Sequence, residues 1–191
     1  MSNALKTILS LCDHSGNWPR FYREAGYNVI SLDIKNGDDV RLLERKYERV
    51  YGILAAPVCT VFASSGARWP RTLDEMREGL ALVDACLRAV VIYRPTLKFW
   101  ALENPIGTLK RYLGQPRMYF NPSDFGDPYT KRTCLWGDFV IPSSLFVSPQ
   151  PVEATEGSKM WARFGGKSEA TKAARSATPL GFAQAFFEAN P

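Results

Sequence analysis

A short apolar run, Val50 to Ala56, constrains the fold more than any other stretch of the sequence. It is too short for an ordinary helix and it ends at Pro57, which favours a buried strand of a parallel sheet. In open α/β sheets, ligands bind beyond the carboxyl ends of the strands. The sequence therefore predicts that Cys59, shortly after Pro57, lies at the functional edge of the sheet.

Further expected strands and helices alternate with this run. Strands are expected at residues 7–11, 28–32 and 97–102, and helices at 19–25, 38–47 and 73–94. Thr72 is expected to cap the longest helix. Its core face is expected to consist of Leu73, Met76, Leu80, Val83, Leu87 and Val90. This alternation predicts an α/β fold, with a mostly parallel sheet and helices on both faces.

Composition limits what the chain can be. Its 191 residues fit one domain, 1–191, and 46% of them are hydrophobic and 23% charged, as in a globular protein. No apolar run suits a membrane span, and residues 1–12 are too short in apolar content for a secretory signal. Four cysteines without C-x-x-C spacing and one histidine predict a reduced, cytoplasmic protein with no metal. The net charge of +5 gives modest support for a polyanionic partner.

Two further candidates lie at strand ends. Glu103 follows the strand at 97–102, so its carboxyl would reach the edge of Cys59, partly desolvated and able to donate a hydrogen bond. Asp33 follows the strand at 28–32, where doubly wound folds hold a ribose hydroxyl. Each has a structural alternative: Cys59 as a small buried hydrophobe, Glu103 as a cap and Asp33 as a turn residue.

Five stretches of the chain together carry a recognisable set of motifs. Pro57-Val58-Cys59, with Phe62 and Gly66, is followed by Glu103-Asn104-Pro105. Leu9 to Asp33 forms a strand, turn and helix before them, and Pro128 to Gly137 and Ser176 to Phe186 come after. In type and order these stretches resemble the motifs of DNA cytosine 5-methyltransferases, above all small, phage-type members.

The resemblance implies a Rossmann-like, S-adenosylmethionine-dependent methyltransferase fold. In the family, a cysteine thiolate adds to carbon 6 of a flipped-out cytosine and makes carbon 5 attack the methyl donor, while a protonated glutamic acid bonds ring nitrogen 3. The catalytic residues implied are Cys59, Glu103 and Arg132, with Lys131 as the less favoured alternative to Arg132. The S-adenosylmethionine-binding residues implied are Leu11, Cys12, Asp13, Ser15, Gly16, Trp18, Asp33, Ile34, Asp39, Pro57, Ser176, Ala177 and Thr178. The substrate-binding residues implied are Phe62, Ser64, Ser65, Gly66, Arg68, Asn104, Pro105 and Lys131.

The chain also departs from the family. Val58 replaces a proline, Ser10 and Asp13-His14-Ser15 replace an acidic, glycine-rich first motif, and Tyr129 stands where a glutamine is usual. Residues 141–172 are expected to form an irregular loop and 175–190 the terminal motif with its helix, which leaves no room for a target-recognition domain. We therefore expect DNA, duplex or single-stranded, as the partner, with low or short sequence specificity. Recognition of the base sequence would come from a loop such as 123–131 or from a protein partner.

Two alternatives remain open at this stage. The same chemistry can act on RNA or on a free pyrimidine nucleotide. The chain can also be a catalytically weakened relative that only binds nucleic acid. A phage-encoded protein of either kind would work in the host cytoplasm.

Overall fold

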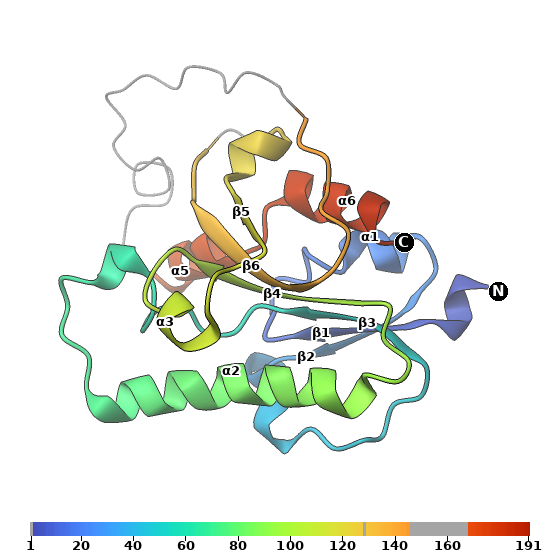
Figure 1. The fold of residues 1–191 in the computed structure, drawn as a ribbon, viewed down its shortest axis with the longest axis horizontal. Helices are drawn as coiled ribbons and strands as arrows, with labels where there is room; N and C mark the ends of the chain where they lie inside the picture. The colour runs from blue at the N-terminus through green and yellow to red at the C-terminus, as the bar shows by residue number, and fades with distance from the viewer. Residues whose placement is uncertain (1, 128, 146–167) are drawn as a thin grey trace.

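The computed structural model describes residues 2–127, 129–145 and 168–191, and these form a layered α/β structure (Figure 1). The strands are β1 (Thr7–Leu11), β2 (Asn28–Leu32), β3 (Val50–Ala55), β4 (Phe99–Pro105), β5 (Met118–Phe120) and β6 (Thr133–Asp138). The α-helices are α1 (Arg20–Glu24), α2 (Leu73–Tyr93), α3 (Lys110–Leu113), α5 (Glu169–Ser176) and α6 (Leu180–Ala189). Short 3-10 helices are η1 (Asn3–Leu5), η2 (Ile34–Asn36), η3 (Val40–Leu42), η4 (Ser64–Gly66) and η5 (Pro122–Phe125). The predicted α/β class is confirmed.

The described strands form one six-stranded sheet in the order β2-β1-β3-β4-β6-β5. β1, β2, β3 and β4 are parallel, whereas β6 runs antiparallel to both β4 and β5, so the sheet is mostly parallel but mixed. β4 pairs with β3 only as far as Leu102, yet it continues to Pro105 along β6. The predicted strand end at 102 was therefore wrong, because the antiparallel partner supplies hydrogen bonds beyond the end of β3.

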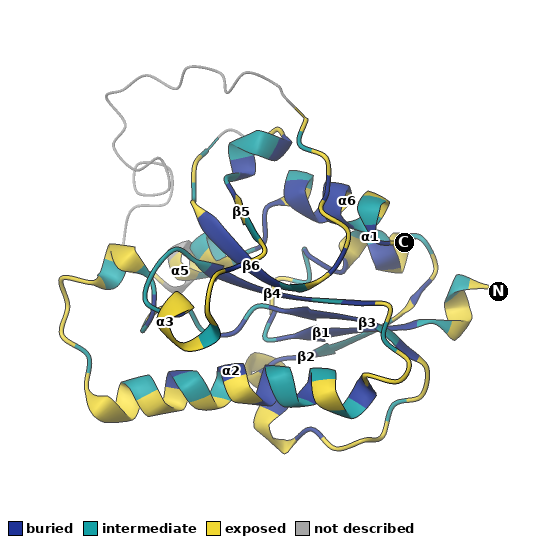
Figure 2. Cartoon of the chain, viewed as in Figure 1, coloured by how far each residue is buried: buried dark blue, intermediate teal, exposed yellow. Residues whose placement is uncertain are grey.

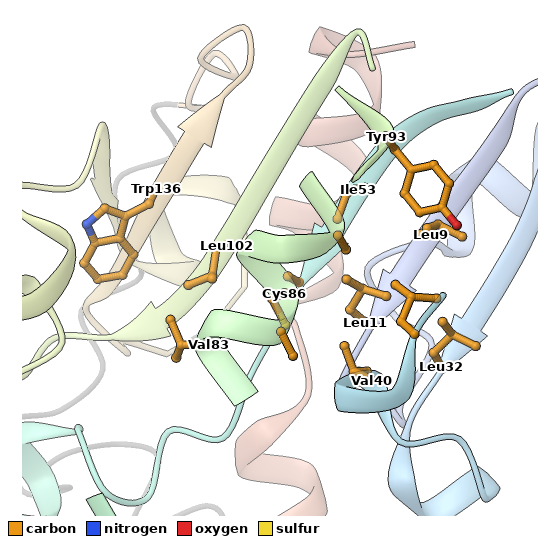
Figure 3. Packing of buried hydrophobic residues seen from close by; sticks show 14 of the residues in the cluster. Leu9, Leu11, Leu32, Val40, Ile53, Val83, Cys86, Tyr93, Leu102 and Trp136 are labelled. Carbon is orange, nitrogen blue, oxygen red and sulfur yellow. The ribbon is translucent and has the colours of Figure 1, made fainter. Parts of the chain in front are cut away.

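Helices cover both faces of the sheet, as predicted. On one face α2 packs against the strands, with Val83 and Cys86 near Leu11 and Leu102 (Figure 3). On the other face α1 and α6 form an aromatic cluster, in which the Trp18 ring lies 5.7 Å from that of Phe186. Each face thus has its own buried core.

The long helix α2 begins and ends where the sequence indicates. Thr72 and Glu75 form a reciprocal capping box at its start, and the helix stops before Pro95. Its predicted core face is only partly right: Val83 is buried, but Leu73 is 83% exposed. Figure 2 shows that the first turns of α2 consist mostly of exposed residues. The residues buried on α2 are Gly79, Val83, Ala85, Cys86, Ala89 and Tyr93. Several of these are small, which lets the helix axis approach the sheet closely.

Two expected helical segments differ. Residues 38–47 contain only the single turn η3, because Arg88 donates hydrogen bonds to the carbonyls of Arg41 and Leu43, at 2.7 and 2.9 Å, in place of a further helical turn. The terminal segment is divided into α5 and α6, since Pro179 is extended and cannot continue α5. In the expected loop at 141–172, residues 146–167 lie outside the described residues. Pro128, the first residue of the motif at 128–137, also lies outside them.

Candidate active site

The carboxyl ends of the parallel strands carry most of the predicted site residues. The first turn follows β1, Asp33 follows β2, and the Cys59 loop, defined as residues 57–66, follows β3. Glu103 lies near the end of β4, and Lys131 precedes the antiparallel strand β6. One edge of the sheet therefore collects segments that are far apart in sequence.

Hydrogen bonds fix the Cys59 loop at both ends. At its start, the buried Asn104 amide donates to the carbonyl of Pro57 at 3.1 Å. The carbonyl of Cys59 accepts from the backbone N–H groups of Phe62 and Ala63, at 3.0 and 2.9 Å. Asn104 is thus an anchor of the loop, and Cys59 sits at the start of a tight turn.

The far end of the loop is fastened to the segment after β4. Ser64 N donates to the carbonyl of Ile106 at 2.9 Å, and Thr108 N donates to that of Phe62 at 2.9 Å. Gly107 lies so close to the Phe62 backbone that any Cβ would clash with it. Phe62 itself is 1% exposed and packs against Gly79 of α2. This predicted substrate residue therefore anchors the loop to α2.

Glu103 is paired with Lys131. The Lys131 Nζ lies 3.6 Å from Glu103 Oε1, and their side chains are 12% and 6% exposed. Glu103 Oε1 accepts no hydrogen bond from the described residues. A ligand that donates or shares a proton at this carboxyl would complete its coordination.

Arg132, the favoured cation in the sequence analysis, points elsewhere. Its guanidinium lies over the ring of Tyr119, 5.3 Å from the centroid, and it is exposed. Its carbonyl accepts from Ile106 N at 2.9 Å, which ties the start of β6 to the segment after β4. The cation beside Glu103 is therefore Lys131.

The Cys59 thiol experiences opposing influences. Burial raises its pKa above the ordinary value, and Glu103 adds to this rise, whereas Lys131 and Arg175 act to lower it. Lys131 and Arg175 each lower the pKa of this thiol, but burial outweighs them, so the pKa lies above its ordinary value. Arg175 belongs to α5, so the terminal motif also contributes to the electrostatics of this thiol.

The first turn is organised by Asp13, which is buried. Its Oδ1 accepts from the Ser15 hydroxyl and from Gly16 N, and its Oδ2 accepts from Trp18 N at 3.2 Å. Cys12 and Gly16 both have positive φ, 60° and 66°, which bends the chain sharply after β1. Leu11 is fully buried in the core. The carboxylate of Asp13 is thus used by the turn itself.

The terminal motif lies against this turn. Asn17 Nδ2 donates to the carbonyl of Thr178 at 3.1 Å, and Trp18 packs on Phe182 and Phe186 of α6. Ser176 and Ala177, also predicted to bind the cofactor, precede Thr178 at the end of α5. The structure therefore brings together the first and last motifs.

Asp33, Ile34 and Asp39, the predicted cofactor residues after β2, differ in exposure and in their contacts. Asp33 is 8% exposed, and its Oδ1 accepts from Lys35 N at 2.9 Å, while no described residue bonds its Oδ2. Ile34 is 66% exposed. Asp39 instead pairs with Arg41 at 2.8 Å, and hydrogen bonds from Arg41 lower the pKa of this carboxyl.

The remaining predicted substrate residues lie in the Cys59 loop or near it. Ser64 and Ser65 are exposed on η4, Gly66 ends η4, and Pro105 ends β4. Arg68 is exposed, and its guanidinium lies 5.3 Å from the Trp69 ring centroid.

A surface hollow of about 670 Å³ lies at the opposite edge of the sheet, between Tyr51, Phe99, Phe139 and Asn190. None of the predicted site residues lines it. Within residues 2–127, 129–145 and 168–191, no cluster of three potential metal ligands occurs. No helix in the same part of the chain is long and apolar enough to cross a membrane.

Sequence reasoning missed Gly79 and Gly107, whose lack of a side chain lets Phe62 of the Cys59 loop pack closely. It also missed that Arg175 acts on the Cys59 thiol. Gly79 was the detectable signal, because a glycine inside a helix is unfavourable unless a neighbour requires the space. Comparison of the chain with models of known protein families and with curated proteins found no match.

Proposed function

We propose that this chain is a Rossmann-like, S-adenosylmethionine-dependent enzyme that methylates carbon 5 of cytosine in DNA through Cys59. One observation carries the proposal: the Cys59 loop, Glu103 and Lys131 are brought together by hydrogen bonds and an ion pair at the carboxyl edge of the sheet. That edge is where ligands of open α/β folds bind. The first turn, Asp33 and the terminal motif adjoin it.

Cys59 is proposed as the nucleophile. Its thiolate adds to carbon 6 of the base, which places electron density on carbon 5. After methyl transfer, a general base removes the proton from carbon 5. The electron pair of that bond then forms the ring double bond, the carbon–sulfur bond breaks and the thiolate is restored. Because burial raises the pKa of Cys59, the nearby Lys131 is needed to favour the thiolate.

Glu103 is proposed to hold the base. Its Oε1 is buried without a hydrogen bond from the described residues, and a carboxylic acid here can donate to ring nitrogen 3 as negative charge develops there. Base binding would compete with Lys131 for Glu103. Lys131, rather than Arg132, is thus the cation proposed to act at this site.

The residues beside the first turn fit S-adenosylmethionine in part. Asp33 offers Oδ2 to a ribose hydroxyl, and the exposed Ile34 offers an apolar surface to an adenine ring. Asp13 is committed to the turn and offers little to the ligand. When bound, this cofactor supplies an electrophilic methyl group.

A second reading keeps the fold but removes the reaction, and the use of Asp13 by its own turn favours it. A decayed site, however, has no physical reason to retain beside a thiol a buried acid whose Oε1 accepts no hydrogen bond from the described residues. The same chemistry on RNA or on a free nucleotide differs only in substrate.

The test is methyl transfer from labelled S-adenosylmethionine to duplex DNA, single-stranded DNA, RNA and dCTP, with native protein and Cys59→Ser. We expect transfer to DNA by the native protein only, and denaturant-resistant attachment to a 5-fluorocytosine oligonucleotide. Cys86→Ala is the control, since this buried thiol lies on α2; it should lower the melting temperature but keep activity. Folded native protein that binds the methyl donor yet neither transfers nor becomes attached would refute the reaction.

A further inference from the structure

Three exposed aromatic side chains surround the Cys59 loop. Trp69 is 58% exposed, Tyr112 52% and Tyr119 38%. Each comes from a different segment: the loop before α2, helix α3 and the edge strand β5. Exposed aromatic rings that lie near one another often mark a binding surface, so these three indicate that a ligand binds near the loop.

Described contacts connect each of these residues to the site, through the backbone for Trp69 and Tyr119 and through the ring for Tyr112. Trp69 N donates to the Gly66 carbonyl at 3.0 Å, at the end of the Cys59 loop. The Tyr112 ring lies 6.3 Å from that of Phe62. Tyr119 pairs with Cys134, which in turn pairs with Asn104, the residue after Glu103.

Cations accompany the rings. Arg68 lies over Trp69 and Arg132 over Tyr119, each 5.3 Å from the ring centroid, and Arg111 is exposed beside Tyr112. Residues 56–73, 105–115 and 129–137 contain no aspartate or glutamate, although the whole chain has 19. The cations in these ranges are Arg68, Arg71, Lys110, Arg111, Lys131 and Arg132. Glu103 pairs with Lys131, but no carboxylate of the described residues forms an ion pair with the other five cations, so this part of the surface is positive.

We infer that an unpaired polynucleotide strand binds across this surface, which we define as Trp69, Tyr112 and Tyr119 with Arg68, Arg111 and Arg132. Bases stack on exposed aromatic rings only when they are released from pairing, and arginines follow the phosphates. The bases of a duplex are already stacked on one another and offer no free ring face to these side chains. The inference rests on the proposed function for its location, and it makes an unpaired strand the substrate class of the site.

Binding is measured without a methyl donor, by fluorescence anisotropy of labelled dT20, rU20 and a 20-base-pair duplex at equal salt, using Cys59→Ser protein. We expect the unpaired strands to bind at least about tenfold tighter than the duplex. Alanine at Trp69, Tyr112 or Tyr119 should each weaken dT20 binding by about fivefold or more, the lower end of measured base-stacking effects. Arg68→Gln should reduce the steepness of the salt dependence.

The controls lie at the opposite edge or on the outer side of α2. Val91→Ala removes an exposed apolar side chain, and Arg94→Gln removes an exposed cation, so neither should alter dT20 binding beyond about twofold. Comparison of dT20 with rU20 tells which sugar the strand carries. Equal or tighter duplex binding, or aromatic variants that bind like native protein, would overturn the inference.

This result is separable from the proposed reaction. Methyl transfer to duplex DNA together with weak dT20 binding would remove the inference and leave the reaction. Tight, aromatic-dependent dT20 binding without methyl transfer to any substrate would do the opposite.

Discussion

Cys59 is surrounded by groups that act on its thiol in opposite directions. Burial and Glu103 raise its pKa, and Lys131 and Arg175 lower it. Since the thiolate is the reactive form, alkylation by iodoacetamide should accelerate as pH rises through this raised pKa. In Lys131→Gln the acceleration should move to higher pH, because one lowering influence is lost.

The measurement is the initial alkylation rate of the Cys59 peptide, followed by mass spectrometry from pH 6.5 to 10. Lys110→Gln is the matched control: Lys110 acts on Cys134 and not on Cys59. An unchanged pH profile in Lys131→Gln would mean that Lys131 does not influence the thiol.

Glu103 can be tested by its two simplest replacements. Glu103→Gln keeps a hydrogen-bond donor for ring nitrogen 3, whereas Glu103→Ala leaves none. We expect kcat of the glutamine variant to fall by about tenfold and that of the alanine variant by about a hundredfold or more, as for loss of a general acid. Native-like rates in both variants would make Glu103 a structural residue of β4.

Asp33 has a role in its own turn as well as a proposed role in cofactor binding. Asp33→Ala should weaken S-adenosylmethionine binding by about 1.5–3 kcal/mol, the value of a hydrogen bond to a charged group. Asp33→Asn keeps an acceptor for Lys35 N and separates the two roles: it should bind the cofactor more weakly than native protein but retain the native melting temperature. Calorimetry gives the dissociation constants, and equal values in all three proteins would refute the assignment.

Among the elements, the Cys59 loop depends on a close approach between backbones. Gly107→Ala would push the carbonyl of Phe62 away and displace the loop. We expect a loss of about 1–3 kcal/mol in the free energy of unfolding, typical of overpacking, and at least a tenfold fall in methyl transfer. Denaturant unfolding and the transfer assay measure the two effects.

The control for this change is Gly26→Asn. Gly26 has φ +81°, and an added Cβ there meets nothing within 4 Å, so asparagine is tolerated sterically and tolerates this φ better than most residues. It should leave methyl transfer unchanged. If Gly107→Ala also transfers methyl groups at the native rate, the position of the loop is not critical.

The strands show how far sequence patterns extend. The expected strands at 7–11 and 28–32 were confirmed, because short apolar runs between turn residues are local signals. The choice between Lys131 and Arg132 was not local. The side chains of adjacent residues in an extended chain point to opposite sides. Which of the two cations faces Glu103 therefore depends on the register of β6 against β4. No residue nearby in the sequence specifies that register. The catalytic roles themselves remain predictions.

At the scale of the whole molecule, two groups with raised pKa values, the phenol of Tyr22 and the thiol of Cys134, make the stability depend on pH in the alkaline range. Burial raises the pKa of Tyr22 far above its ordinary value and that of Cys134 to about 11. In the unfolded chain these groups lose their protons at about pH 10 and 8.5. Their contribution to stability is complete below those values and declines as pH rises through them. The melting temperature should therefore fall from about pH 8.5 upward.

Tyr22→Phe tests this decline. It removes the 2.8 Å hydrogen bond to the Asn190 carbonyl, so stability at pH 7 should fall by about 1 kcal/mol, but the loss above about pH 9.5 should be shallower than in native protein. Tyr112→Phe changes an exposed ring and should leave the decline as it is. Parallel curves for native protein and Tyr22→Phe would show that this phenol does not control alkaline unfolding.

The packing of α6 on the first turn also has a consequence for biosynthesis. Trp18 leaves the ribosome long before Phe182 and Phe186, which cover it. Until they emerge, the aromatic face of the sheet has no cover of its own and exposes surface that attracts chaperones and proteases. The order of translation thus gives this fold a long vulnerable interval, which ends only when α6 has been made.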